Sequence, residues 1–293
     1  MNLHLPAGDA ALVTEHAAAK INLALHITGQ RDDGYHLLDT LVVFTQAGDT
    51  IRAAPSDEDR FTLSGQFASI LQADADNLVL RARDLIRQLR PELPPVALDL
   101  EKSLPVASGI GGGSADAAAT LRALSGMLDA PLSEAELSVA ALSLGADVPM
   151  CLASHPLRVR GIGESLAPVR GLPVLHMVLV NPGMAVSTPT VFGSLLEKQN
   201  APLPELPGNV AFSDLVDWLR KTRNDLQHPA SVQVPQIGQA ISALDAAGAA
   251  FSRMSGSGAT CFGLFPDATA AQAAARSLAS RSPAWYVKAT QTI

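Results

Sequence analysis

Residues 14–30 alternate apolar with mostly polar side chains, which is the two-residue period of a β-strand. The apolar positions of this run would share one face: Ile21, Leu23, Leu25 and Ile27. Lys20 and Asn22 would lie next to each other on the opposite face. The run therefore predicts a strand that presents an amine and an amide together.

A turn and further strands follow this first run. The sequence RDDG at 31–34 carries the Asp-Gly signal of a tight turn. A second strand is expected through 41–44, and two more at 50–53 and 61–63. Because these short strands follow one another closely, they predict an antiparallel meander.

Three helices are expected between residues 76 and 145. The third has the clearest boundaries, because Ser133 and Glu136 fit a capping box and Gly145 fits a C-terminal cap. The first begins at an N-cap of Asp76 or Asn77. The expected elements are helix 76–90, strand 96–100, an alanine-rich helix at 114–128 and helix 133–145.

The second half of the chain has a different order of elements. From about residue 173, strands and helices are expected in the order β-α-β-β-α-β, which is typical of the ferredoxin-like arrangement. The proline-rich stretch 201–208 is expected to be a surface loop within this half. The elements are strand 174–181, helices 211–222 and 231–248, strands 249–254 and 259–265, helix 267–280 and strand 284–292.

Composition narrows the class of protein. Of 293 residues, 47% are apolar and 17% are charged, and the formal net charge is −7. Nucleic-acid binding is disfavoured, because it draws on an excess of Lys and Arg. Cys151 and Cys261 form no CxxC pair, so we expect no metal site and two buried thiols. Without a signal pattern or a run of 18 apolar residues, a soluble cytoplasmic protein is expected.

A glycine-rich loop is the strongest chemical signal. Four of the five residues at 109–113 are glycine, and the loop leads into a predicted helix N-terminus. Glycine allows a ligand to touch the main chain, and free N–H groups at a helix start favour an anion. The loop predicts a phosphate cradle; the alternative is a turn whose glycines let Ala117 and Ala118 pack. The residues of the loop do not fit a Rossmann fingerprint or a nucleophile elbow. The sequence has no Gly-Lys dipeptide for a Walker A loop and no HRD or DFG motif of a protein kinase.

Asp147 stands just past a predicted helix end, in the sequence GADVP at 145–149. An acid fixed among apolar neighbours can have a tuned reactivity, but it could equally cap the next helix, with Pro149 in the first turn. Lys20 could likewise be an ordinary solvated lysine. Placed beside Asp147, it would keep the carboxylate ionised and stabilise a forming alkoxide.

Two further segments carry candidate chemistry. The sequence RMSGSGA at 253–259 has more small residues than a hairpin needs, which fits close approach to a phosphate as well as a tight turn. Tyr35 and His36 follow the Asp-Gly turn in a chain with two tyrosines. They fit either recognition of a ring or ordinary hairpin packing.

Several segments match one known family in order along nearly the whole chain. They are AAAKINLALHITGQRDDGYHLLDTLV (17–42), DNLVLRA (76–82), LPVASGIGGGSADAAATLRAL (104–124), LGADVPMCL (144–152), NPGMAVSTPTVF (181–192), ND (224–225) and MSGSGATCFGLF (254–265). Together they resemble the GHMP kinases. The combination of AKINL with RDDGYH is more specific than the glycine loop, which the whole family shares.

The resemblance implies an α+β fold with two domains. These are a ribosomal-S5-like N-terminal domain with the ATP-binding glycine loop (1–168) and a ferredoxin-like C-terminal domain on the substrate side (169–293). It also implies transfer of the γ-phosphoryl group of ATP, with Mg²⁺, to the C2 hydroxyl of a cytidylyl-methylerythritol substrate of non-mevalonate isoprenoid synthesis. The implied partners are small molecules, without nucleic acid or membrane, and a monomer or weak homodimer is expected.

The resemblance also assigns roles residue by residue. Asp147 is implied as the catalytic base and Lys20 as its charged neighbour. The implied ATP contacts are Gly109, Gly111, Gly112, Gly113, Ser114, Asn77 and Lys102. The implied substrate contacts are Asn22, Tyr35, His36, Thr188 and Phe192, where Tyr35, His36 and Phe192 would recognise the cytidine.

The chain departs from the family pattern at two positions, and three alternatives stay open. Ala107 and Ala115 stand where many members have glycine and serine, so fewer hydroxyls face phosphate and Mg²⁺. A sibling kinase of homoserine, mevalonate or a sugar would have no reason for RDDGYH. A non-catalytic nucleotide-binding module would not need both Lys20 and Asp147, and the net charge opposes a nucleic-acid-binding protein.

Overall fold

The computed structural model describes residues 12–71 and 76–293, which form two compact units. The units are interleaved along the chain. The first contains 12–17, Gly48–Leu104 and Gly113–Leu152, and the second contains Ala18–Ala47, Pro105–Gly112 and Ala153–Ile293. The predicted domains 1–168 and 169–293 instead divide the chain at one point, and they stay a prediction.

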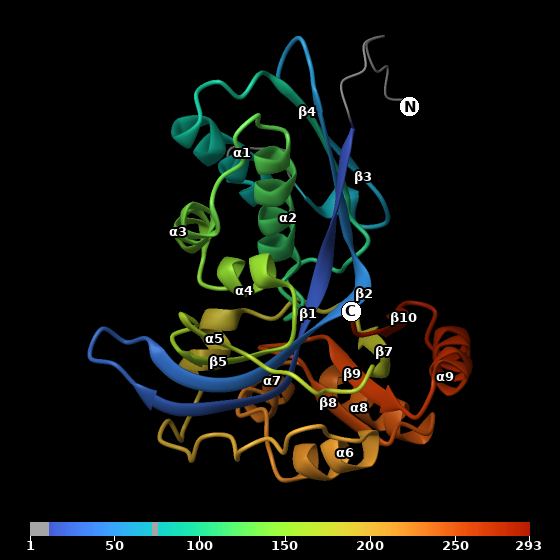
Figure 1. Cartoon of the computed structure of the whole chain (residues 1–293). Coiled ribbons are helices and arrows are strands. Elements are labelled where there is room, and N and C mark those ends of the chain that lie inside the picture. Colours follow the sequence, from blue (N-terminus) through green and yellow to red (C-terminus); the bar gives the residue numbers. More distant parts are fainter. Residues whose placement is uncertain (1–11, 72–75) are drawn as a thin grey trace. The chain divides into compact units, whose positions relative to one another are not determined.

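The first unit combines strands with helices (Figure 1). The end of β2 (His36–Pro55) pairs antiparallel with β4 (Val96–Glu101), and β3 (Arg60–Ser64) pairs with β4 in parallel. The helices are α1 (Leu78–Leu89), α2 (Gly112–Gly126), α3 (Glu134–Leu144) and α4 (Val148–Ala153), and a 3₁₀ turn spans Ala68–Ile70. In Figure 1, α1, α2 and α3 stand to one side of β3 and β4.

The helix boundaries of this unit follow from the predicted caps. Asn77 caps α1 by accepting a hydrogen bond from the Val79 backbone at 3.0 Å. Ser133 and Glu136 form the predicted capping box of α3, and Gly145 is its C-cap. Helix α2, which contains most of the expected alanine-rich helix 114–128, is buried through its alanines.

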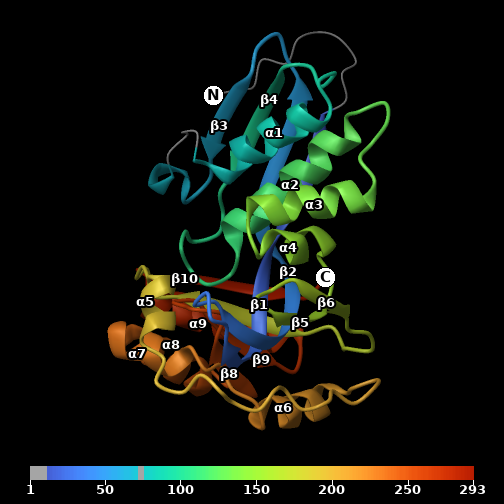
Figure 2. The same cartoon turned by 90° about the vertical axis from the view of Figure 1, so that its left-hand side faces the viewer.

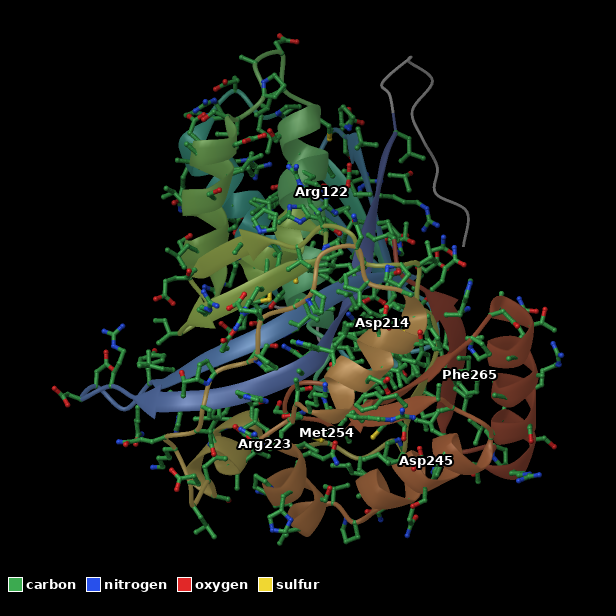
Figure 3. The ribbon with its side chains drawn as sticks, turned by 60° about the horizontal axis from the view of Figure 1, so that its bottom comes forward. Arg122, Asp214, Arg223, Asp245, Met254 and Phe265 are labelled. Atoms are coloured by element: carbon green, nitrogen blue, oxygen red, sulfur yellow. The ribbon has the colours of Figure 1, made fainter. Side chains whose placement is uncertain are left out.

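The second unit contains a four-stranded antiparallel sheet (Figure 2). Its strands lie in the order β10-β7-β9-β8, with β7 at His176–Asn181, β8 at Phe251–Met254, β9 at Cys261–Phe265 and β10 at Tyr286–Gln291. Helices α8 (Gln236–Ala246) and α9 (Ala268–Arg281) pack on it. This is the predicted ferredoxin-like order. Met254 and Phe265, labelled in Figure 3, belong to its core.

Further elements complete the second unit. β1 (Val13–Gln30) begins in the first unit and pairs with β2. β5 (Leu157–Gly161) pairs with β2 and with β6 (Ser165–Pro168). The remaining helices are α5 (Thr188–Gly193), α6 (Phe212–Arg220) and α7 (Gln227–Gln233).

Three sequence expectations are wrong. The runs at 41–44 and 50–53 belong to one strand, β2, and the meander is absent because β3 pairs in parallel with β4 and not with β2. Gly48 lies within β2, and a Cβ there would lie 2.5 Å from the Ala17 carbonyl oxygen, so the glycine allows two strands to approach. The predicted helix 231–248 is divided, since α8 begins after Pro235.

Two other expectations concern the cysteines and membrane helices. Cys151 and Cys261 are buried thiols, as predicted, and burial raises the pKa of the Cys261 thiol. Among residues 12–71 and 76–293, no helix has the length and apolar character to span a bilayer.

Candidate active site

The glycine loop lies against β1 in the second unit. The Lys20 backbone N–H donates to the Ile110 carbonyl oxygen at 2.9 Å. Gly111 has a φ of +67°, and a Cβ there would lie 3.4 Å from Cβ and Cε of Lys20. The Lys20 side chain is 6% exposed. The loop and the predicted catalytic lysine are thus brought together by backbone pairing.

The same loop meets the segment 254–260. A Cβ at Gly109 would lie 2.6 Å from the Gly258 nitrogen, and one at Gly256 would lie 2.7 Å from the Gly109 oxygen. The Ser255 hydroxyl donates to that Gly109 oxygen at 3.2 Å. Gly109 and Gly256 are therefore required by contact between two loops, and close packing accounts for them without a ligand.

The C-terminal end of the loop is more open. Helix α2 begins at Gly112 and has no acidic residue in its first turn. A Cβ at Gly113 would meet only a Leu78 methyl carbon, at 3.7 Å. Gly113 is exposed and Ser114 is half-buried. The N–H groups and the positive end of the helix dipole are thus placed to receive an anion.

Asn22 presents an unsatisfied acceptor. Its amide nitrogen donates to the Thr40 hydroxyl at 2.8 Å, and its backbone N–H donates to the Ser255 hydroxyl at 3.0 Å. Its Oδ1 atom is buried and has no hydrogen-bond partner. Such an atom normally costs about 1–3 kcal/mol, so a substrate hydroxyl would be a favourable partner.

The predicted base-recognition residues lie together in the second unit. The His36 and Phe192 rings are 5.1 Å apart, and the His36 Nε2 atom is buried without a partner. Burial lowers the pKa of His36, and the charge of Lys198 lowers it further. Tyr35 is 62% exposed. The Thr188 hydroxyl, at the start of α5, bonds to the Ser257 hydroxyl at 2.7 Å.

Asp147 and Asn77 belong to the first unit. Asp147 is half-buried and directly precedes α4, with Pro149 in the first turn, which fits the predicted helix-capping alternative as well as catalysis. Lys20 belongs to the second unit, so its pairing with Asp147 stays a prediction. Asn77 serves as the cap of α1, and its contact with adenine also stays a prediction.

Lys102 has partners that the sequence did not indicate. Its side chain is 2% exposed, and its ammonium group contacts Asp49 at 2.5 Å and Asp116 at 2.6 Å. Burial opposes its charge, but Asp116 and Asp49 raise the pKa of Lys102 above its ordinary value. Its ammonium group is thus enclosed by carboxylates. The contact of Lys102 with adenine stays a prediction.

Sequence reasoning missed the residues that hold segment 254–260. The Asn224 amide donates to the Met254 and Gly256 carbonyl oxygens, each at 2.8 Å. Arg253 donates to the Leu23 carbonyl oxygen at 2.9 Å. Both residues lie in segments that the sequence singles out, 224–225 and 253–259, but their partners are 30 or more residues away, so their contacts could not be predicted from these segments. Among residues 12–71 and 76–293, no three His, Cys, Asp or Glu side chains cluster as metal ligands would.

The comparisons with known proteins now decide the family. The model of the GHMP kinases N terminal domain matches residues 77–155, and that of the GHMP kinases C terminal domain matches 209–284. A relative from Mesorhizobium japonicum is 53% identical over 282 residues, which cover 96% of each chain. The chain belongs to the GHMP kinase family.

Two relatives of this GHMP kinase have the same protein name. The Mesorhizobium japonicum protein is named "4-diphosphocytidyl-2-C-methyl-D-erythritol kinase". A protein of the same name from Agrobacterium fabrum is 52% identical over 301 residues, covering 100% of both chains. These relatives match 96% and 100% of the GHMP kinase, so the likeness is not confined to the glycine loop.

Solved structures confirm the predicted two-domain α+β GHMP kinase fold. A crystal structure of 4-(cytidine 5'-diphospho)-2C-methyl-D-erythritol kinase matches with a TM-score of 0.79 and 30% identity, covering 96% of this chain and 100% of that one. Homoserine kinase from Cytophaga hutchinsonii matches with a TM-score of 0.70 and 18% identity, covering 100% of this chain and 97% of that one. Because its sequence identity is only 18%, the similarity to homoserine kinase supports the fold of this GHMP kinase and not its function.

Proposed function

We propose that this chain transfers the γ-phosphoryl group of ATP to the C2 hydroxyl of 4-diphosphocytidyl-2-C-methyl-D-erythritol, in the non-mevalonate pathway to isoprenoid precursors. The observation that carries this proposal is the 53% identity to the Mesorhizobium japonicum relative over nearly the whole chain. The contact between His36 and Phe192 supports it, because aromatic rings suit the flat face of a pyrimidine. The chain is an ATP-dependent small-molecule kinase, as its family membership implies.

The proposed mechanism relies on positioning and charge. Gly109, Gly111, Gly112, Gly113 and Ser114 form the triphosphate loop, whose main-chain N–H groups and helix start receive the phosphates. The C2 oxygen attacks the γ-phosphorus, the bond to the bridging β,γ-oxygen breaks, and ADP leaves. Asp147 accepts the hydroxyl proton, and the Lys20 ammonium stabilises the developing alkoxide. Asn22 Oδ1 would accept a hydrogen bond from the substrate, which satisfies its buried acceptor.

Mg²⁺ is proposed to arrive with ATP. It would neutralise charge on the β- and γ-phosphates, and we assign it no protein ligand. The loop fits a nucleotide triphosphate because the first turn of α2 carries no acid that would repel it. Removal of the metal by a chelator should therefore abolish turnover while the protein stays folded.

The substrate is tested by ADP release in a coupled assay. The cytidylyl substrate, homoserine, mevalonate and a sugar are each offered with ATP and Mg²⁺, and only the first should give ADP at a sustained rate. In Asp147→Asn, kcat should fall about 10²- to 10⁴-fold, while the affinity for ATP is retained. Asp129→Asn, at an exposed aspartate of the same unit, is the matched control. Full activity of Asp147→Asn would remove the base from the mechanism.

The cytidine site has its own test. Phe192→Ala should raise KM for the cytidylyl substrate at least several-fold, since stacking on a base is worth about 1–3 kcal/mol. Leu196→Ala changes a 99% exposed residue of the neighbouring segment and should leave KM as it is. Equal KM values for the two variants would exclude the aromatic clamp of Tyr35, His36 and Phe192.

The proposal also covers cellular location, oligomeric state and partners. We place the enzyme in the cytoplasm, as a monomer or weak homodimer with no nucleic-acid partner. Cell fractionation, sedimentation across protein concentrations and a DNA-binding assay across salt concentrations test these points. We also keep residues 1–168 as the ATP-binding domain and 169–293 as the domain on the substrate side. The matched segments 77–155 and 209–284, which lie within these ranges, support that division.

A further inference from the structure

Lys102, Asp49 and Asp116 form a buried charged triad in the first unit. The exposed fractions of the three side chains are 2%, 0% and 4%. The Lys102 ammonium group contacts a carboxylate oxygen of Asp49 at 2.5 Å and one of Asp116 at 2.6 Å. Burying three charged groups is costly, so a purely apolar cluster would serve stability at least as well. The triad therefore calls for an explanation other than stability.

The triad joins the two chain segments between which the glycine loop runs. Asp49 accepts hydrogen bonds from the Ser103 backbone N–H at 2.6 Å and the Leu104 backbone N–H at 2.7 Å. These residues directly precede Pro105–Gly112, the segment that contains most of the glycine loop. Asp116 lies in α2, four residues after the helix begins at Gly112. The single ammonium group of Lys102 thus links the entry of the loop to the helix at its exit.

The entry segment is also fixed by its backbone. The Lys102 N–H donates to the Ser64 carbonyl oxygen at 2.7 Å, and its own carbonyl oxygen accepts from the Phe67 N–H at 3.0 Å. Gly65 allows this approach, because a Cβ there would lie 2.6 Å from the Lys102 oxygen. Lys102 is therefore held on both sides before its side chain reaches Asp116.

We propose that the triad of Lys102, Asp49 and Asp116 is a positioning device for the phosphate loop: it sets the separation of the loop's two ends and the place of the α2 N-terminus that receives the triphosphate. This inference rests on the proposed use of ATP and adds positioning residues to it. Displacement of a reacting group by about 1 Å can cost about 10²-fold in rate, so an anchor at the two ends of the loop affects how the triphosphate is positioned.

The decisive variant is Asp116→Asn, which keeps the shape and an acceptor for Lys102 but removes the charge. We expect the Kd and KM for ATP to rise about tenfold, because a charge-assisted hydrogen bond becomes a weaker neutral one. The KM for the cytidylyl substrate should stay unchanged. The matched control is Asp99→Asn, a 7% exposed aspartate of the same unit that bonds to Arg52 at 2.9 Å. It should lower stability without changing the affinity for ATP.

A second pair of variants separates positioning from folding. Lys102→Met leaves Asp49 and Asp116 facing each other, and Lys102→Met with Asp116→Asn relieves that repulsion. We expect the double variant to regain stability while its ATP affinity stays low. Recovery of both together would mean that the triad acts only through folding, which overturns the proposal.

The binding measurement distinguishes this proposal from the proposed function. Calorimetric titration of each variant with ATP and Mg²⁺ requires no phosphoryl acceptor. If the wild-type enzyme binds ATP and phosphorylates a different alcohol, the proposed substrate fails while the positioning role can still be read from Kd. If Asp116→Asn and the double variant both bind ATP like the wild type, the positioning role is refuted whatever the substrate is.

Discussion

Lys102 in the first unit and Arg253 in the second are both buried cations, with exposed fractions of 2% and 8%, yet their surroundings differ. Lys102 contacts two carboxylates. Arg253 donates to the carbonyl oxygens of Leu23, Leu219 and Thr222 and to the Thr222 hydroxyl. Its guanidinium carbon lies 4.5 Å from the centre of the Phe251 ring.

The difference follows from the shape of the two side chains. An ammonium group is a compact point charge, so burial is tolerated when carboxylates stand beside it, and these raise the pKa of Lys102 against the effect of burial. A guanidinium group is a planar fork that can satisfy several neutral oxygens at once. Burial lowers the pKa of Arg253 to about 10, and the nearby charge of Arg223 contributes, yet Arg253 stays charged at neutral pH. Lys102 thus links two carboxylates from different parts of the chain, whereas Arg253 binds mainly backbone carbonyl oxygens.

The largest effect is expected from breaking the charged cluster. Lys102→Met removes the ammonium group and leaves two buried carboxylates without it, so the free energy of unfolding should fall by about 3–5 kcal/mol. Urea denaturation at neutral pH measures this loss, and Lys221→Met, at an exposed lysine, is the control. A loss no larger than that of the control would mean that the cluster is not held by charge.

The same cluster should make stability depend on pH. Burial raises the pKa of Asp116 from 3.8 to about 7, although Lys102 opposes the rise. The folded protein then binds this proton more tightly than the unfolded chain, so stability should fall as pH rises from about 4 to 7. A shift of this size corresponds to at most about 4 kcal/mol. Urea denaturation across that pH range should show a smaller decline in unfolding free energy for Asp116→Asn than for the wild type. Parallel declines in the two proteins would contradict the assignment to Asp116.

A smaller effect is expected from changing the shape of the second cation. Arg253→Lys keeps the charge but cannot reach all four acceptors, so carbonyl oxygens such as that of Leu23 lose their donor. The unfolding free energy should fall by about 1–3 kcal/mol. Arg276→Lys changes an exposed arginine and serves as the control in the same denaturation series. Equal stability of Arg253→Lys and the wild type would show that charge alone suffices at this position.

The smallest effect concerns His26, which lies near Arg223 (Figure 3 labels Arg223). His26 accepts the Arg223 backbone N–H at Nε2, at 2.9 Å, and Nδ1 lies 2.8 Å from the Ala201 carbonyl oxygen. Burial lowers the pKa of His26 below 6.5, so the folded state favours the neutral ring and stability should decline as pH falls below 6.5. The pH dependence of stability due to His26 is thus opposite in sign to that due to Asp116.

Thermal unfolding between pH 7.5 and 5.5 tests the histidine. Substitution of His26→Gln should flatten the acid side of the profile, whereas His228→Gln, at an exposed histidine, should leave it unchanged. An acid slope that survives in His26→Gln would assign it to another group.

Local signals explain which parts of the fold the sequence predicted. The alternation at 14–30 and the capping box at Ser133 involve neighbouring residues, so both elements were placed within about one residue. The expected separation of the runs 41–44 and 50–53 was wrong, because β2 continues through Gly48, where a Cβ would meet His16 and Ala17 of another strand. Most of the candidate site came from family resemblance. The structure adds the contact of His36 with Phe192 and the unpartnered Asn22 Oδ1.

The sequence by itself determined the order of most strands and helices, the glycine loop before α2 and the family to which the chain belongs. Only the tertiary structure decided why Gly109 must be glycine, where Lys102 directs its charge and how Arg253 is satisfied. Lys102 and Asp49 are 53 residues apart, and Gly109 meets a segment 146 residues away. Periodicity and caps act over a few residues, whereas a buried charge or a close backbone contact depends on partners that folding alone brings within reach.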